Sequence, residues 1–96
     1  RSYRSIGQSL NAALPADHGC VLGRNLSESN RALIDYWAGV PLRPENAPGS
    51  ARCEWLLTFR DASQNRNLDI RGWTIASEMR RPSERSERFI LYRRAR

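Results

Sequence analysis

Apolar residues in the first half of the chain recur at spacings that predict a helix, a short strand and a second helix. The apolar positions between residues 2 and 14 fall on one helical face, and Pro15 ends this pattern. Cys20-Val21-Leu22 predicts a short buried strand. A second helix should end near Gly39, and its apolar face consists of Leu26, Leu33, Trp37 and Val40.

The second helix has a candidate start in Asn25-Leu26-Ser27-Glu28. Asn25 can act as the capping residue, and Glu28 can reach back from the third helical position. The tripeptide Asn25-Leu26-Ser27 also matches the acceptor pattern for N-glycosylation. The capping role explains the same residues, and we favour it.

The second half of the chain predicts strands. Residues 40–43 can form only an edge strand, because Pro41 and Pro44 cannot donate to a central ladder. Residues 54–59 are nearly all apolar, which is typical of a central strand covered on both faces. Residues 73–80 alternate, so one face should be buried, and residues 89–92 should complete a hairpin with them. The last four residues read as a basic tail.

This order predicts an α/β fold. We expect a small sandwich with a mixed, partly parallel sheet of about four to five strands, two helices and a C-terminal antiparallel hairpin. Residues 1–96 should form one soluble domain, because no apolar run approaches the roughly 18 residues that span a bilayer. The sequence shows neither an initiator Met nor a signal peptide, which indicates a domain excised from a larger protein.

The two cysteines occupy matching places in the pattern. Cys20 and Cys53 each stand at the entry of a predicted strand. If the two strands are parallel neighbours, their starts lie at one edge of the sheet, and the Cα atoms can come within the roughly 4.4–6.8 Å that a disulfide needs. A disulfide would place the domain outside the cytosol. Two buried free thiols packing as small apolar groups are the alternative.

The charge is strongly positive and carried entirely by arginine. The chain has 16 basic residues, no lysine and a net charge of +6, which excludes a lysine nucleophile and favours anionic partners such as lipid phosphates, lipopolysaccharide or nucleic acid. The best candidates for binding an anion or a lipid headgroup flank the hairpin: Arg71, Arg80, Arg81, Arg85 and Arg88. The competing interpretation is a solvated charged face in which these arginines alternate with Glu78, Glu84 and Glu87.

No pattern of catalytic residues emerges from the sequence. His18 is the only histidine and has no serine or cysteine at motif spacing, and a single histidine with two distant cysteines makes no zinc pattern. Asp35 and Glu54 are the carboxylates nearest to buried positions. A catalytic pair is conceivable there, but surface salt bridges with neighbouring arginines explain them better. We therefore predict no catalytic residue, metal or cofactor in this chain.

Several stretches taken together carry a resemblance that spans almost the whole chain: residues 9–15, Gly19-Cys20-Val21, Asn25-Leu26, residues 31–39, residues 53–57, Gly72-Trp73, Arg81-Pro82 and residues 88–94. In their order and spacing they resemble the C-terminal domain of bacterial multi-spanning membrane glycosyltransferases of the mannosyltransferase-like and aminoarabinose-transferase-like kind. Such enzymes move a sugar from a polyprenyl-phosphate carrier to an acceptor on the outer side of the cytoplasmic membrane.

The resemblance implies a non-catalytic, periplasmic accessory domain, because the catalytic acidic residues of such enzymes lie in loops of the transmembrane part. Its partners would be the transmembrane part of the same parent chain and either anionic lipid headgroups or the glycan acceptor. A nucleic-acid-binding module is an alternative, motivated by charge and by Trp55, Trp73 and Tyr92, but the arginines are scattered and no RNA- or DNA-binding motif is present. A stand-alone interaction domain also remains open.

Overall fold

The computed structural model describes residues 3–63 and 67–96, and these residues form two α-helices, a short 3-10 helix and five strands. In chain order the elements are α1 (Arg4–Ala13), β1 (Val21–Arg24), α2 (Glu28–Ala38), β2 (Leu42–Pro44), the 3-10 helix η1 (Ser50–Arg52), β3 (Trp55–Asp61), β4 (Trp73–Met79) and β5 (Glu87–Arg94). The strands make one sheet in the order β2-β1-β3-β5-β4. Its β1–β2 and β1–β3 pairs are parallel, and its β3–β5 and β4–β5 pairs are antiparallel. The predicted α/β class, mixed sheet and C-terminal hairpin are confirmed.

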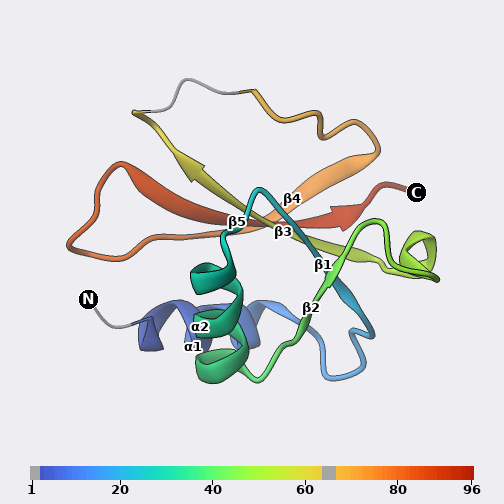
Figure 1. Cartoon of the computed structure of the whole chain (residues 1–96), viewed down its shortest axis with the longest axis horizontal. Coiled ribbons are helices and arrows are strands. Elements are labelled where there is room, and N and C mark those ends of the chain that lie inside the picture. The colour runs from blue at the N-terminus through green and yellow to red at the C-terminus, as the bar shows by residue number, and fades with distance from the viewer. Residues whose placement is uncertain (1–2, 64–66) are drawn as a thin grey trace.

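The main core fills the space between the two α-helices and one face of the sheet (Figure 1). Helix and strand patterns place apolar side chains from both layers there. The buried members are Tyr3, Ile6, Leu10, Leu14, Val21, Ile34, Val40, Trp55, Leu57, Met79, Phe89 and Leu91. Burial of each large side chain contributes about 1.5–3 kcal/mol, so this layer supplies most of the stability.

A smaller apolar cluster lies on the opposite face of the sheet. Its buried members are Leu22, Cys53, Leu56, Ile90 and Tyr92. Both α-helices pack on the first face, so the cover here comes from partly buried Ile70 and Trp73 instead. No helix within residues 3–63 or 67–96 has the length and apolar character needed to cross a bilayer.

The predicted disulfide is present. β1 and β3 are parallel neighbours with Val21 opposite Trp55, and the cysteine that precedes each strand lies at the same edge of the sheet. Cys20 and Cys53 are bonded, with 5.1 Å between their Cα atoms. The alternative of two free thiols is thereby removed.

The predicted start of the second helix is wrong by two residues. Asn25 has a left-handed backbone (φ 59°), and α2 begins only at Glu28. Ser27 is the cap: its hydroxyl accepts a 3.0 Å hydrogen bond from the backbone N–H of Asn30, whose side chain accepts one from the Ser27 backbone. These two reciprocal hydrogen bonds satisfy the backbone N–H groups of Ser27 and Asn30. A cap formed by Asn25 and Glu28 would have to satisfy as many. Asparagine tolerates the left-handed region, so Asn25 can make the sharp turn out of β1 instead.

β4 departs from the expectation of one buried face. The sheet register shifts between Ile75 and Ser77, so a bulge interrupts the strand. Ile75 lies opposite Tyr92 on the outer face and is 57% exposed, whereas Met79 lies opposite Phe89 and is buried under the helices. One extra residue in a strand reverses its alternation, and the apolar residues of β4 are therefore divided between the two faces.

The end of the chain also differs from the prediction of a basic tail. Arg93 and Arg94 belong to β5, which extends to Arg94. The Arg93 guanidinium lies 5.0 Å from the ring centre of Trp55, and that of Arg94 lies 4.3 Å from the ring centre of Trp73. Arg94 also donates hydrogen bonds of 3.1 and 2.8 Å to the carbonyl oxygen of Cys53. The two guanidinium groups therefore join the end of β5 to the starts of β3 and β4.

The two α-helices cross at Gly7, the residue of α1 that has no side chain. A Cβ added to Gly7 would lie 2.7 Å from the backbone carbonyl carbon and oxygen of Trp37 and 2.9 Å from its Cβ. Real Cβ atoms do not approach that closely, so Gly7 is what allows α1 and α2 to pack on the same face of the sheet.

We expect removal of the disulfide to lower stability without changing the fold. The bond closes a loop with a sequence separation of 33 residues, for which loss of the cross-link costs about 3.7 kcal/mol. Urea denaturation of Cys20→Ser/Cys53→Ser should therefore show a lower midpoint than the oxidised chain. The unmutated chain under reducing conditions is the control and should match the double variant. An unchanged midpoint would contradict the structural role of the bond.

Substitution of Gly7 by alanine should destabilise the chain, although alanine favours a helix over glycine by about 1 kcal/mol. The new methyl group must displace the Trp37 backbone, and overpacking of this kind costs about 1–3 kcal/mol. Gln8→Ala is the matched control, because Gln8 is exposed on the same helix and should stay within about 0.5 kcal/mol. If the Gly7→Ala chain is as stable as the control in urea, α1 and α2 can move apart and accommodate the methyl group without a measurable loss of stability.

Candidate functional site

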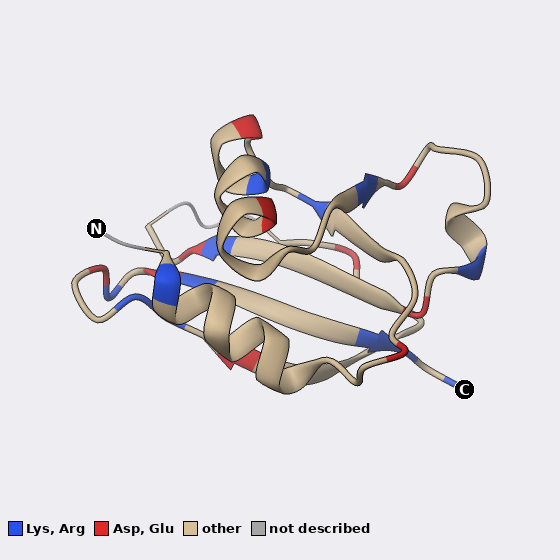
Figure 2. Cartoon of the chain, turned by 90° about the horizontal axis from the view of Figure 1, so that it is seen from below, with Lys and Arg blue, Asp and Glu red and all other residues tan. Residues whose placement is uncertain are grey.

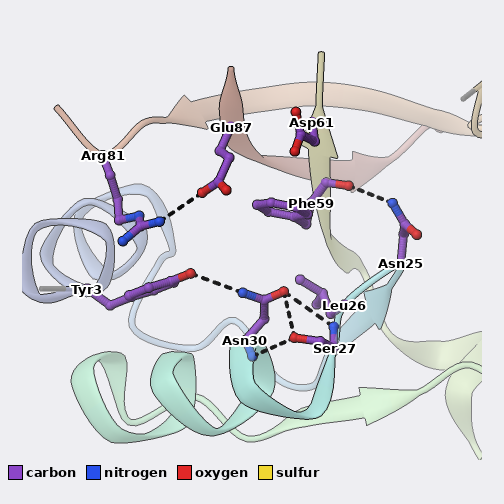
Figure 3. Close-up of a pocket in the computed structure, with 9 residues that line it drawn as sticks. All are labelled: Tyr3, Asn25, Leu26, Ser27, Asn30, Phe59, Asp61, Arg81 and Glu87. Atoms are coloured by element: carbon purple, nitrogen blue, oxygen red, sulfur yellow. Dashed lines mark hydrogen bonds and ion pairs between the residues drawn. The ribbon is translucent and has the colours of Figure 1, made fainter. Parts of the chain in front are cut away.

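A cavity of about 660 Å³ opens at the end of the sheet where β1 and β3 finish (Figure 3). It lies between the first residues of α1, the N-terminus of α2 and the start of β5. Its lining comprises Tyr3, Asn25, Leu26, Ser27, Asn30, Phe59, Asp61, Arg81 and Glu87. The carboxyl ends of parallel strands are the usual place for ligands in α/β sheets, and the volume falls within the roughly 300–1,000 Å³ of small-molecule sites.

The two carboxylates of the cavity come from paired strand ends. Asp61 ends β3 and lies directly opposite Glu87, the first residue of β5. Both therefore point to the face of the sheet that carries the helices, as Phe59 does two residues earlier. Asp61 and Glu87 are far apart in the sequence, and only the antiparallel β3–β5 register brings them together.

Arg81 is the only cation of the lining. Its Nη2 donates to Oε1 of Glu87 at 2.8 Å, and its guanidinium lies 4.8 Å from the ring centre of Tyr3. The side chain is only 15% exposed, and its buried Nε has no hydrogen-bond partner among the described residues. The hydrogen bond that Arg81 donates to Glu87 raises the pKa of Arg81 above its already high value, so the guanidinium stays charged.

A polar network ties the helices together at the floor of the cavity. The Asn30 amide donates to the Tyr3 hydroxyl at 3.1 Å, which joins α2 to the residue that precedes α1 (Figure 3). On the opposite wall, Nδ2 of Asn25 donates to the carbonyl oxygen of Phe59 at 2.8 Å. This bond ties the β1–α2 connection to β3, and it leaves the amide oxygen of Asn25 as an acceptor.

The charge of the cavity is opposite in sign to that of the chain. Two hydrogen bonds from Ser63 to Oδ1 of Asp61, one from its backbone N–H at 3.0 Å and one from its hydroxyl at 2.8 Å, lower the pKa of Asp61. Asp61 is therefore ionised at neutral pH. With Glu87 and Arg81, the lining carries two negative charges and one positive charge. A chain of net charge +6 thus surrounds a site of net charge −1.

The structure does not gather the five arginines predicted to bind an anion. Arg71 is bonded to Asp69 at 2.8 Å, Arg88 approaches Glu78 at 3.3 Å, and Arg81 is bonded to Glu87 in the cavity. Arg80 and Arg85 are exposed and have no carboxylate partner among the described residues. Figure 2 shows acidic and basic residues interspersed along the loops and strand ends. An anion-binding role for the five residues stays a prediction.

The remaining candidates from the sequence form no second site. Asp35 is exposed on α2, and Glu54 lies 3.7 Å from Arg96, so Glu54 fits the salt-bridge interpretation. No group of three or more histidine, cysteine or acidic side chains that could hold a metal occurs in residues 3–63 and 67–96.

The aromatic residues that motivated nucleic-acid binding are engaged in the fold. Trp55 and Tyr92 are buried, and Trp73 is partly buried beside Arg94. Their faces are therefore not presented for stacking on bases, which single-stranded nucleic-acid sites require. Comparison with protein-family models, with curated protein sequences and with solved structures found no match to this chain.

Sequence reasoning found only Arg81 among the cavity residues. Tyr3, Asp61 and Glu87 lie far apart in the sequence and share no motif. Asn25, Ser27 and Asn30 lie close together, just before and within the first turn of α2. The one available signal was position: Asn25 and Asp61 come two or three residues after the predicted strands 20–22 and 54–59, and the carboxyl ends of parallel strands meet at one end of a sheet.

The low pKa of Asp61 should depend on Ser63. In Ser63→Ala the hydroxyl donor is lost and the backbone N–H remains, so the pKa should rise part of the way toward the ordinary value of about 3.9. Titration of the carboxyl carbon of Asp61 by NMR measures this directly. Ser63→Thr keeps the hydroxyl and should leave the pKa low. Identical titrations in the alanine and threonine variants would show that the hydroxyl bond does not act on Asp61.

Proposed function

We propose that this chain is a non-catalytic accessory domain of an integral-membrane glycosyltransferase that moves a sugar from a polyprenyl-phosphate carrier to an acceptor. The domain would lie on the periplasmic side of the bacterial inner membrane. The resemblance of the sequence to the C-terminal domains of such enzymes motivates this proposal, and it covers core and turn residues from residue 9 to residue 94.

The observation that supports a periplasmic location is the Cys20–Cys53 disulfide. Disulfides persist in oxidising environments such as the bacterial periplasm and are rare in the cytosol. Cys53 is a buried member of the outer apolar cluster, and Cys20 packs against the same cluster. A bond that is part of a core must form as the domain folds, which supports an oxidising folding compartment.

The accessory role fits the kinds of residue that the domain offers. The cavity holds two carboxylates, one arginine and amide groups, but its arginine is tied to Glu87 and no nucleophile stands beside a base there. Such a set can recognise a ligand by hydrogen bonds. The reaction itself would belong to the transmembrane part of the same parent chain, which is the partner that the proposal requires.

Contact with the membrane surface is a second element of the proposal. Arg80 and Arg85 lie between β4 and β5 and are exposed, and each arginine near an anionic leaflet contributes about 1 kcal/mol. Arg71 and Arg88 would contribute less, because their charges are already balanced by Asp69 and Glu78. The domain would therefore make a weak, supporting contact with lipid headgroups.

The test is the reading frame upstream of Arg1 together with the location of the domain in cells. We expect about ten or more hydrophobic spans upstream, with acidic residues in the first outward loop. A protease added to spheroplasts should digest the domain of the full-length protein, and a cytosolic marker protein in the same sample should survive. A cytosolic start, or a domain protected until the membrane is opened, would overturn the proposal.

A further inference from the structure

We infer that the cavity at the carboxyl ends of β1 and β3 binds an uncharged saccharide of one or two units. The first reason is the mixture of hydrogen-bonding groups in its wall. The carboxylates of Asp61 and Glu87 and the amide oxygen of Asn25 accept, whereas the hydroxyl of Tyr3 and the guanidinium of Arg81 donate. A sugar hydroxyl both donates and accepts, so a ring bearing several hydroxyls can satisfy both kinds of group.

The charge of the cavity argues against an anion. Arg81 is the single cation of the lining, and its charge is already balanced by Glu87 at 2.8 Å. Asp61 remains as an ionised carboxylate on the same wall, held so by Ser63. A phosphate or a lipid headgroup would face a lining of net negative charge, which is unfavourable.

The polar groups are fixed before any ligand arrives. Glu87 and the ring of Tyr3 hold Arg81, the carbonyl of Phe59 holds Asn25, and Asn30 holds the hydroxyl of Tyr3. Pre-positioned side chains lose little entropy on binding, which is what allows a small polar ligand to gain affinity. Phe59 and Leu26 add an apolar wall for the C–H face of a sugar ring.

The proposed function gives this ligand a source, because the acceptor of such a transferase can be a glycan. The assignment of the ligand as a sugar unit of the acceptor rests on the proposed function, whereas the preference for an uncharged polyol rests on the lining alone.

Titration of the ¹⁵N-labelled chain with methyl α-glucoside, methyl α-mannoside and methyl α-arabinoside tests the inference. We expect at least one glycoside to shift the side-chain amide signals of Asn25 and Asn30 saturably, with a dissociation constant in the millimolar range. Asp61→Asn should weaken this binding about tenfold, because a charged acceptor is lost. Asp69→Asn is the matched control: Asp69 is an exposed carboxylate outside the cavity, and its removal should leave binding unchanged.

Asn25→Gly provides a second variant should Asp61→Asn disturb the fold, because glycine accepts the left-handed backbone of Asn25. It should weaken glycoside binding as well, read from the signals of Asn30. Inorganic phosphate and ethylammonium are the comparison ligands. Saturation of the same signals by phosphate or ethylammonium but by no glycoside would overturn the inference, as would the lack of a saturable shift with any glycoside. Glycoside affinities of both cavity variants equal to that of the unmutated chain would overturn it as well.

The two proposals fail separately. Glycoside binding by a chain whose gene encodes no membrane spans would keep the saccharide site and remove the transferase role. Membrane spans upstream with no glycoside binding would keep the role and remove the site.

Discussion

The parallel pairing of β1 with β3 is the interaction on which the rest of the structure depends. Its amino end carries the disulfide, because the cysteine before each strand lies at the same sheet edge. Its carboxyl end opens into the cavity, where Asn25 continues the pairing by a side-chain bond to the carbonyl of Phe59. Parallel neighbours are joined through long connections, so chain entropy opposes their pairing. A covalent bond at one end of the pair offsets this cost and fixes the register that shapes the other end.

The fold was largely predictable because its signals are local. Apolar runs and helical stripes predicted the main elements, and the matching positions of Cys20 and Cys53 suggested a disulfide that would form if their strands were parallel neighbours. The errors have local causes as well. A bulge of one residue in β4 reversed the face that holds Met79, and the reciprocal bonds of Ser27 and Asn30 outcompeted Asn25 as the cap. In each case the apolar pattern was sound, and hydrogen bonding that a pattern does not contain decided the detail.

The cavity could not be predicted to the same degree, because its residues are brought together by the pairing of segments that are distant in the sequence. Asp61 meets Glu87 only through the β3–β5 ladder, and Tyr3 meets Arg81 only when the loop after β4 folds over α1. A net charge of +6 suggests a site for anions, which stays a prediction, whereas the lining of this cavity carries a net negative charge. The reason is that many of the arginines serve the fold, as Arg94 does on Trp73 and at the carbonyl of Cys53.

Arg81 shows how a charge that serves the fold can also line a cavity. Burying a guanidinium is costly unless it is paired, and here Glu87 and the face of Tyr3 supply the compensation. The same contacts use up the charge that a phosphate would need, yet they leave N–H groups in the cavity wall. A wall of this kind favours ligands that accept a hydrogen bond without carrying a charge. The selectivity that we infer for the cavity would therefore follow from how the arginine is buried, and the positive charge of the whole chain would have little influence on it.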